Sequence, residues 1–290
     1  DIDTYAMAAA SIDEALRNAV CVGVDLDLIA GLDNFCWPDP VESMKTPDGR
    51  YKLAQLVRAN RALDDVCRAY QLPCISGKDS MKNDATINGT KISVPPTLLF
   101  SLIGNHKDVR KAVSSDFKTV GDIIYLVGET HQELGASELA FMLYDETNGK
   151  SGIGGQIPQI DTTRNLALYR SLTDSMSNGL VASAHDCSDA GLAAALTECC
   201  FGCDSGAVLD ISNLLNHNKN LDIWGALFGE SLGRILVSVK PQDSQLFEES
   251  MMDHECNKIG IVTSNDMIIF NNQNQIVLSA NMKELRDAWK

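Results

Sequence analysis

Leu180-Val-Ala-Ser-Ala-His185 runs directly into Asp186-Cys-Ser-Asp-Ala-Gly-Leu192, and this junction is the strongest indication of the fold. The apolar run predicts a strand, and the pattern from Asp189 to Cys200 predicts a helix that follows it at once. Strand–helix units of this kind are typical of α/β domains. Ser188 or Asp189 is expected to cap the helix through its side-chain oxygen.

The start of that helix is also a candidate binding site. Free N–H groups at a helix N-terminus attract anions, and Asp186, where the strand ends, is placed to hold a metal ion on such an anion. Capping and packing alone would also account for these residues. His185 has no evident nucleophile to act on, so a role as general base is weakly supported.

The alternation of strands and helices extends over the rest of the chain, but its rhythm changes after Gly104-Asn-His106. We therefore expect an N-terminal α+β domain (residues 1–110) and a C-terminal α/β domain (residues 111–290), with the boundary between about Asn105 and Thr119. Pro95-Pro96 interrupts one predicted strand, which must be bent or at an edge. Helices are predicted over Tyr5–Val20, Lys52–Tyr70, Asn165–Asn178, Asp189–Cys200 and Gln242–Met252. Strands are predicted over Leu28–Trp37, Pro73–Ser80, Lys91–Ile103, Ile123–Val127, Leu180–His185, Arg234–Val239, Ile259–Val262, Met267–Phe270 and Gln275–Leu278.

Length and charge exclude several classes of protein. The 290 residues accommodate two domains, and the formal charge is 24 − 39 = −15. A polyanionic surface repels phosphate backbones, so no nucleic-acid partner is expected. No apolar run approaches the ~20 residues that cross a bilayer, so no membrane span is expected. The chain begins at Asp1 without a Met or a signal-peptide core, which suggests a piece of a longer protein.

Nine cysteines are scattered through the predicted helices and strands. An odd number without framework spacing favours reduced thiols and a cytoplasmic location. Cys200-Phe-Gly-Cys203 is formally a C-x-x-C motif. Because it has no second pair and no His at ligand spacing, we prefer an inert buried cluster to a metal or redox role.

Glu14 and Asn18 are four residues apart on the first predicted helix. Both oxygens then project from one face, which suits an Mg²⁺ ion that bridges to nucleotide phosphates. An ordinary solvated face would have the same spacing. Asp13 lies off that face.

Ser76-Gly-Lys-Asp-Ser-Met-Lys82 follows an apolar strand and places glycine, cationic and hydroxyl groups together. Such a segment can approach and neutralise a phosphate. It is not a Walker A loop, because the leading Gly is missing and Lys78 is not followed by Ser or Thr. A polar strand end with a Lys78–Asp79 ion pair is the alternative. Phe228-Gly-Glu-Ser-Leu-Gly-Arg234 is an acidic, glycine-flanked turn that would pass as a loop with a salt bridge.

Taken in order, these segments resemble the formylglycinamide ribonucleotide amidotransferase family, also called phosphoribosylformylglycinamidine synthase, within the superfamily of aminoimidazole ribonucleotide synthetase. The similar stretches span nearly the whole chain: Glu14-Ala-Leu-Arg-Asn18, Leu32-Asp-Asn-Phe35, Pro73-Cys-Ile-Ser-Gly-Lys-Asp-Ser-Met-Lys82, Gly128-Glu-Thr130, Glu133-Leu-Gly-Ala-Ser-Glu138, His185-Asp-Cys-Ser-Asp-Ala-Gly-Leu192 and Leu227-Phe-Gly-Glu-Ser231.

The resemblance implies the second half of a tandem synthase region, whose N-terminal domain builds a barrel with a partner half. It implies a C–N bond-forming ligase of purine biosynthesis that uses ATP and ammonia from a glutaminase domain or subunit. The missing N-terminal half of the synthase would be the main partner, and a homodimer through the N-terminal domain is a further possibility. The fragment alone would be inactive.

The resemblance also assigns residues. Glu14, Asn18 and Asp186 match ligands of Mg²⁺, and Ser188 matches a contact to ATP or ADP, at an auxiliary nucleotide site. A further acidic ligand lies upstream of Asp1 in the family. Asp33, Gly77, Lys78 and Ser80 match the active-site wall that faces substrate and ATP. Because Lys is not a normal Mg²⁺ ligand, Lys78 is expected to contact phosphate directly.

Two departures leave alternatives open. The family's usual Asp-Gly-Gly-Leu is Asp189-Ala-Gly-Leu192 here, and Ala190 could narrow the approach of a nucleotide. The family's glycine-rich ATP loop, catalytic His and glutaminase triad do not occur in the sequence. A non-catalytic assembly module is therefore the alternative function. A selenophosphate- or thiamine-phosphate-type enzyme is a more distant one.

Overall fold

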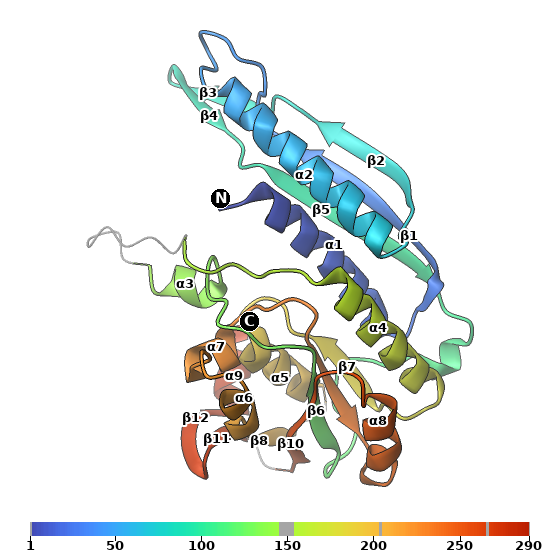
Figure 1. Ribbon diagram of the computed structural model, residues 1–290. Helices are drawn as coiled ribbons and strands as arrows, with labels where there is room; N and C mark the ends of the chain where they lie inside the picture. Colours follow the sequence, from blue (N-terminus) through green and yellow to red (C-terminus); the bar gives the residue numbers. More distant parts are fainter. Residues whose placement is uncertain (1, 145–153, 203–204, 265–266, 290) are drawn as a thin grey trace.

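The computed structural model describes residues 2–144, 154–202, 205–264 and 267–289. Its N-terminal part holds α1 (Thr4–Cys21), β1 (Asp25–Cys36), α2 (Gly49–Ala69), β2 (Cys74–Ser80) and β5 (Thr97–Asn105), with a hairpin of β3 (Asp84–Ile87) and β4 (Thr90–Ser93) between the last two. The three-stranded sheet has the order β2-β1-β5, with β1 parallel to β2 and antiparallel to β5. In Figure 1 this sheet and α2 form the upper layer, and α1 lies beneath them.

The apolar spacing of α1 explains its central position. Its buried side chains include Ala8, Ile12, Leu16 and Val20, which recur every four residues and form one stripe. Asp3 caps the helix, because its carboxylate accepts hydrogen bonds from the N–H groups of Tyr5 (2.7 Å) and Ala6 (3.0 Å). The helix packs on α2 and β5 on one side and on elements of the C-terminal part on the other.

The C-terminal part is built on a seven-stranded sheet of order β12-β11-β8-β10-β6-β9-β7. Its strands are β6 (Ile123–Val127), β7 (Ser183–Asp186), β8 (Gly206–Asp210), β9 (Ile235–Val239), β10 (Cys256–Thr263), β11 (Met267–Asn272) and β12 (Gln275–Asn281). All recorded pairings are antiparallel except that between β8 and β11. The alternation of strands and helices therefore does not produce a parallel sheet here.

Helices cover both faces of this sheet (Figure 1). The helices of this part are α3 (Glu138–Met142), which lies to one side of the sheet, α4 (Thr162–Ser177), α5 (Gly191–Phe201), α6 (Ser212–His217), α7 (Ile223–Phe228), α8 (Ser244–Ser250) and α9 (Met282–Trp289), with short 3-10 turns η1 (Val109–Lys111) and η3 (Pro241–Asp243). Alternate residues of β6 belong to two hydrophobic clusters. Tyr125 and Val127 face the cluster that contains α1 and α4, and Ile124 and Leu126 face the cluster that contains α5. This period of two explains why most of the strand is buried.

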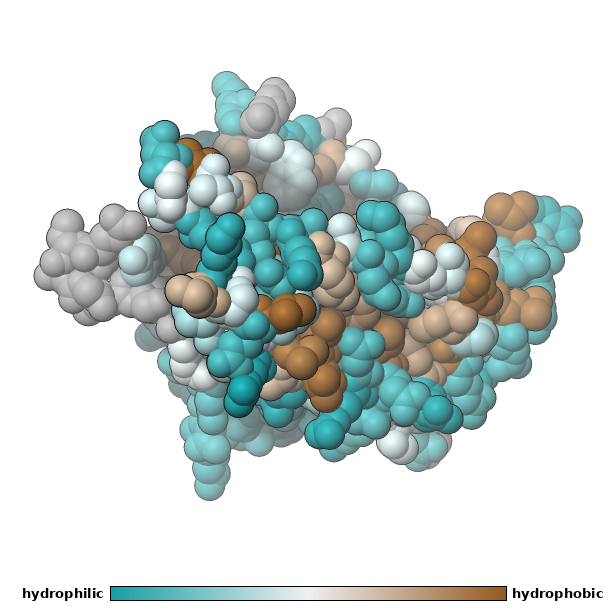
Figure 2. Space-filling view, turned by 90° about the horizontal axis from the view of Figure 1, so that it is seen from above, coloured by the Kyte–Doolittle hydropathy of each residue, from teal (hydrophilic) through white to brown (hydrophobic). Residues whose placement is uncertain are grey.

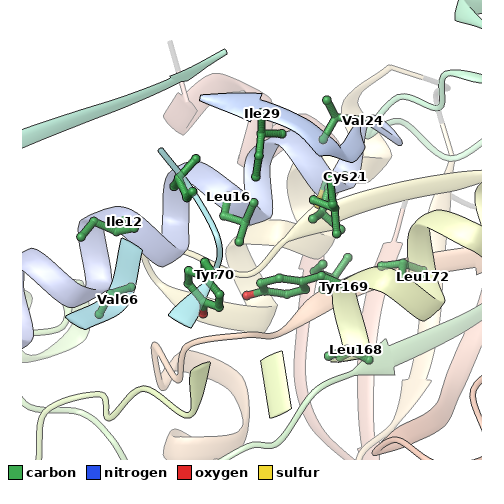
Figure 3. Packing of buried hydrophobic residues seen from close by; sticks show 14 of the residues in the cluster. Ile12, Leu16, Cys21, Val24, Ile29, Val66, Tyr70, Leu168, Tyr169 and Leu172 are labelled. Carbon is green, nitrogen blue, oxygen red and sulfur yellow. The ribbon is translucent and has the colours of Figure 1, made fainter. Parts of the chain in front are cut away.

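The first cluster joins the two parts of the chain. Figure 3 shows Ile12 and Leu16 of α1 in one cluster with Val66 of α2 and Leu168 of α4. A continuous apolar cluster therefore runs from the upper sheet into the lower one. The chain passes between the two sheets in the segment from the end of β5 to the start of β6. None of the helices in the described ranges is long and apolar enough to cross a membrane.

Candidate functional site between α1 and the loop after β7

Glu14 and Asn18 lie on the solvent-facing side of α1, one turn apart. The Asn18 side-chain N–H donates to the Glu14 backbone oxygen at 3.1 Å, so this hydrogen bond uses the amide nitrogen and not the amide oxygen. The predicted geometry of the pair is therefore present: two oxygen-bearing side chains on one face of one helix.

Asp13, next to Glu14, is rotated by about 100° around α1 and is fully buried. Its carboxylate accepts hydrogen bonds from the hydroxyl of Tyr169 at 2.9 Å, from the side-chain amide of Asn165 at 3.0 Å, and from Tyr70 and Arg17. Figure 3 shows the phenol oxygens of Tyr70 and Tyr169 turned into the same space. This cluster ties α1 to α2 and α4 and fixes the rotation of α1, and with it the direction in which Glu14 points.

Arg17 connects α1 to the loop after β7. Its guanidinium donates to the Ser188 hydroxyl at 3.2 Å and lies 3.9 Å from the Asp186 carboxylate. The Ser188 hydroxyl in turn donates to Asp186. Residues that are more than 160 positions apart in the sequence are thus held together by one buried cation.

Negative charge gathers on the solvent side of this contact. Partial burial raises the pKa of Glu14, and the carboxylates of Asp186, Asp189 and Asp13 raise it further, against the opposing effect of Arg17. A cation that binds here would offset the repulsion among these carboxylates and stabilise the ionised form of Glu14. The structure therefore brings Glu14 into the electrostatic range of Asp186, as the predicted site requires.

The donor set fits Mg²⁺ only if the nucleotide contributes. No three His, Cys, Asp or Glu side chains form a metal-binding group in the ranges that the structure describes. Glu14, Asp186 and the Asn18 amide would supply three oxygen atoms at most in monodentate binding. Mg²⁺ commonly retains water and binds phosphate oxygens beside one or two carboxylates, so this set is chemically reasonable for a metal–nucleotide complex.

His185 is an ion-pair partner of Asp186. Its ring nitrogens lie 3.4 Å from Asp186 and 2.6 Å from Glu198. Although burial opposes the charged ring, these two carboxylates raise the pKa of His185 to about 9. The ring is consequently a cation at neutral pH, which disfavours a role as general base.

The prediction that Ser188 or Asp189 caps α5 through its side-chain oxygen is wrong. The residue that precedes the helix is Ala190, in a left-handed conformation with φ of 57°, and it makes no side-chain cap hydrogen bond. The Ser188 hydroxyl is committed to Asp186. The Ala190 N–H donates instead to Glu230 at 2.9 Å, and the same carboxylate oxygen accepts from the Glu138 N–H at 2.9 Å.

The acidic turn around Glu230 thus positions the loop rather than forming an isolated salt bridge. Gly191 is required at the next position because a Cβ there would lie 2.3 Å from the backbone oxygen of Gly229. Arg234 is fully buried and donates to the backbone oxygens of Ser231 and Gly229. Sequence reasoning gave these residues no specific role.

The second predicted group lies some distance away, on the upper sheet. Register pairs Asp33 with Gly77 and Asn34 with Lys78. Asn34 in turn pairs with the exposed Leu99, whereas Asp33 pairs with the buried Phe100. Because side chains alternate between faces, Lys78 and Ser80 project from the open face, and Asp33 projects from the face that carries α2.

Gly77 allows the Asp33 carboxylate to lie against the backbone of β2. A Cβ at Gly77 would be 2.7 Å from Asp33 Oδ1. Burial raises the pKa of Asp33, and Asp79 adds to the effect. Lys78 and Asp79 point to opposite faces of β2, so the alternative of a Lys78–Asp79 ion pair is not supported by their placement. The four predicted wall residues share one pair of strands but do not share one face.

The chain belongs to the AIR synthase related protein family: a sequence model of that family's C-terminal domain matches residues 119–270. This result confirms the resemblance to the aminoimidazole ribonucleotide synthetase superfamily. Cys203 lies outside the described residues, so the preference for an inert cluster at Cys200-Phe-Gly-Cys203 stays a prediction.

Solved structures confirm the fold class. PurL of T. maritima complexed with FGAR is similar with a TM-score of 0.74 and 17% sequence identity, over 98% of this chain and 43% of that chain. PurLQS from Thermotoga maritima is similar with a TM-score of 0.66 and 16% identity, over 97% of this chain and 41% of that chain. HypE in the HypE–HypF complex has a TM-score of 0.66 and 13% identity, over 94% of this chain and 83% of that chain. The chain thus spans less than half the length of the PurL chains but most of the length of HypE.

Proposed function

We propose that this chain is the second half of the synthase region of a phosphoribosylformylglycinamidine synthase, and that its auxiliary site binds a magnesium-bridged nucleotide. The observation that carries the proposal is the convergence of Glu14 on α1 with Asp186 and Ser188 after β7, held by Arg17. The fold of PurL over 98% of this chain supports the assignment. PurL structures complexed with ATP, AMPPCP and ADP support a nucleotide as the ligand.

In this proposal the protein's residues position the ligand and neutralise its charge. A bound Mg²⁺ would offset the phosphate charge at this site. Glu14, Asn18 and Asp186 would hold the metal ion, and the Ser188 hydroxyl would exchange its bond to Asp186 for one to the nucleotide. Arg17 would stay between Asp13 and Asp186 and keep the buried side of the site neutral.

The open face of the upper sheet would form the contact with a partner half. Lys78 and Ser80 lie on this face beside Leu99 and Ile103, each of which is 60% exposed. Figure 2, which looks down on this end of the molecule, shows apolar atoms gathered between hydrophilic ones. A second sheet on this face would bury the apolar side chains and bring Lys78 to a phosphate of ATP or substrate at the shared active site. Asp33, on the other face, would support the β2 backbone through its contact at Gly77.

The ligase reaction would then belong to the assembled enzyme. ATP would activate the amide oxygen of formylglycinamide ribonucleotide, and ammonia from a glutaminase domain or subunit would displace it. The pattern of reduced cysteines supports a cytoplasmic location. A non-catalytic assembly module is the competing proposal, and it is favoured by the small number of acidic metal ligands in the described residues.

Calorimetry with Mg–ADP tests the auxiliary site. We expect the chain to bind, and we expect Glu14→Gln and Asp186→Asn each to weaken binding by about tenfold or more, because each removes a charged metal ligand. Glu249→Gln, on the surface of α8, is the matched control and should leave binding unchanged. If both variants bind Mg–ADP as tightly as the wild-type chain, the nucleotide binds at another site.

Reconstitution tests the ligase. The chain is mixed with the N-terminal half of such a synthase, ATP, ammonia and formylglycinamide ribonucleotide, and ADP formation is measured. Turnover in the mixture, with none in either half alone, is the expected result. Physical association of the halves without turnover would favour the assembly module.

A further inference from the structure

Two cysteines outside the proposed nucleotide site lie in contact with each other. The sulfur atoms of Cys67, near the end of α2, and Cys74, the first residue of β2, are 3.8 Å apart. Cys74 is exposed, whereas Cys67 is buried. An oxidant in solution can therefore reach one thiol, and the second thiol lies directly behind it.

The backbone holds the two thiols in this arrangement. The turn between them is fixed by a hydrogen bond from the Leu72 N–H to the Cys67 backbone oxygen at 2.9 Å. A second bond, from the Gly31 N–H to the Pro73 backbone oxygen at 2.8 Å, attaches the same turn to β1. The contact between the sulfur atoms is thus a consequence of the helix–turn–strand geometry rather than of two flexible side chains.

The pair also lines an open groove. A cavity of about 670 Å³ is bordered by Leu63, Cys67, Arg68, Pro73 and Cys74. It is large enough to admit a peptide-sized disulfide beside Cys74. Burial, reinforced by the neighbouring Cys74, raises the pKa of the Cys67 thiol well above its ordinary range. Because Cys74 is the exposed thiol and the raised pKa of Cys67 lowers its thiolate fraction, Cys74 takes the first step and Cys67, which lies in contact with it, takes the second.

We propose that Cys67 and Cys74 form a reversible dithiol–disulfide switch that is oxidised by a low-molecular-weight disulfide such as oxidised glutathione and that fixes the start of β2 to the end of α2. The Cys74 thiolate attacks one sulfur of the glutathione disulfide, the sulfur–sulfur bond breaks, and one glutathione thiolate leaves. Cys67 then loses its proton and attacks Cys74 Sγ, which releases the second glutathione thiolate. The two protein thiols lose two electrons and two protons in total, and glutathione disulfide is reduced to two thiols.

The consequence of oxidation is local. β2 is an edge strand of the three-stranded sheet, and its recorded partner is β1. A covalent bond at Cys74 would restrain the first residue of the strand that carries Gly77, Lys78 and Ser80. This inference is independent of the nucleotide site and of the ligase assignment, because it concerns only the chemistry of the two thiols.

Peptide mapping tests the switch in the folded chain. The protein is equilibrated in glutathione buffers of graded oxidation, quenched with acid, alkylated and digested with trypsin. Because Arg68 lies between the two cysteines, cleavage separates residues 62–68 from residues 69–78 unless a disulfide joins them. We expect the joined peptides to be the main oxidised product, at about tenfold higher yield than in the urea-unfolded chain, because folding holds the thiols together.

Two variants and one control make the result specific. Cys74→Ser should abolish the joined product, and Cys67→Ala should leave glutathione attached to Cys74. Cys256→Ser, a half-buried cysteine elsewhere, should change neither. A wild-type chain that stops at the mixed disulfide, or that forms the joined product no better than the unfolded chain, would overturn the proposal. Amide hydrogen exchange in β2 should slow severalfold on oxidation, and unchanged exchange would contradict the effect on the strand.

Discussion

At the scale of single residues, the main determinant of the site is a charge that faces the core. Asp13 is fully buried, yet its carboxylate receives donors from α1, from Tyr70 directly after α2, and from α4. A buried carboxylate with all its partners in place is stable, but removal of the carboxylate leaves the buried Arg17 guanidinium without its closest ion-pair partner, with Asp186 at 3.9 Å. Glu14 depends on this arrangement because it occupies the adjacent position on the same helix.

Asp13→Ala should therefore destabilise the protein by about 3–5 kcal/mol, the usual effect of breaking a buried ion pair from one side. Urea denaturation followed by circular dichroism measures the change. Asp64→Ala, which breaks an exposed pair with Arg68 on α2, is the control and should have a much smaller effect. Equal losses for the two variants would contradict the structural role of Asp13.

Ala190 is a second residue that affects stability, through its backbone conformation. It occupies the left-handed region with φ of 57°, which costs roughly 1 kcal/mol for a residue with a Cβ. Ala190→Gly should raise stability by up to about 1 kcal/mol, although the greater freedom of glycine in the unfolded chain offsets part of the gain. Gly191→Ala is the opposite test and should lower stability, because its Cβ would meet the Gly229 oxygen. Thermal unfolding of both variants checks the signs.

Only part of the candidate site could be predicted from the sequence, because some of its residues form a local pattern and others do not. Glu14 and Asn18 could be proposed as a pair because a spacing of four residues places both side chains on one face of a helix. Asp13 and Arg17 were not assigned, although they lie four residues apart within the apolar stripe of Leu16 and Val20. A charged pair in such a stripe is a signal for a buried ion pair. The partners Tyr70, Asn165 and Tyr169 come from other elements and leave no local pattern.

At the scale of elements, periodicity identified the long helices and most strands. The predicted helix Tyr5–Val20 corresponds to α1, and the strand Ile123–Val127 is β6. The strand predicted over Lys91–Ile103 is divided at Pro95-Pro96 into β4 and β5, and β5 lies at the edge of its sheet. The short elements β3, β8, α3, α6, α7 and α9 were not predicted, because few residues give little periodic signal. The antiparallel pairing of the large sheet could not be predicted, because it depends on contacts between distant strands.

The stability that the Asp3 cap contributes at the start of α1 should depend on pH. Burial alone would raise the pKa of Asp3, but the N–H groups of Ala6 and Tyr5 and the Arg58 guanidinium outweigh it and lower the pKa. A carboxyl with a depressed pKa contributes stability above its unfolded pKa, and the contribution is lost as pH falls through its folded pKa.

Asp3→Ala should therefore cost about 1 kcal/mol at neutral pH, and the difference from wild type should shrink below about pH 4. Asp3→Asn keeps an oxygen acceptor for the helix N–H groups but loses the charge, so its cost should be smaller. Urea denaturation at pH 7 and at pH 3 checks both statements. A cost that is the same at the two pH values would show that the carboxylate charge has no part in the cap.

At the scale of the whole molecule, the upper sheet leaves one face uncovered. Apolar residues Leu99 and Ile103 are exposed there, opposite the face that packs on α1 and α2. Sheets with one apolar face usually bury it against another layer. This chain covers 83% of the matched chain in the HypE–HypF complex but only 43% of the PurL chain. A unit of this size therefore makes up most of one protein chain and less than half of another.

Leu99→Asp combined with Ile103→Asp should weaken association with a partner half, or with a second copy of the chain, by about tenfold or more. Leu246→Asp on α8, also an exposed leucine, is the control and should leave association unchanged. Sedimentation velocity over a range of concentrations measures the effect. If the control weakens association and the sheet variant does not, the partner surface lies on the C-terminal part instead.

The proposed function requires that α1 and the loop after β7 meet at one nucleotide site. A crystal structure of the chain with ADP and Mn²⁺, in which the anomalous signal locates the metal, shows whether they do. We predict a single manganese peak bound by Glu14 and Asp186 with the Asn18 oxygen nearby, and a phosphate in contact with Ser188. Nucleotide and metal bound at any other place, with the contacts of Asp186 to Arg17, His185 and Ser188 unchanged, would contradict it.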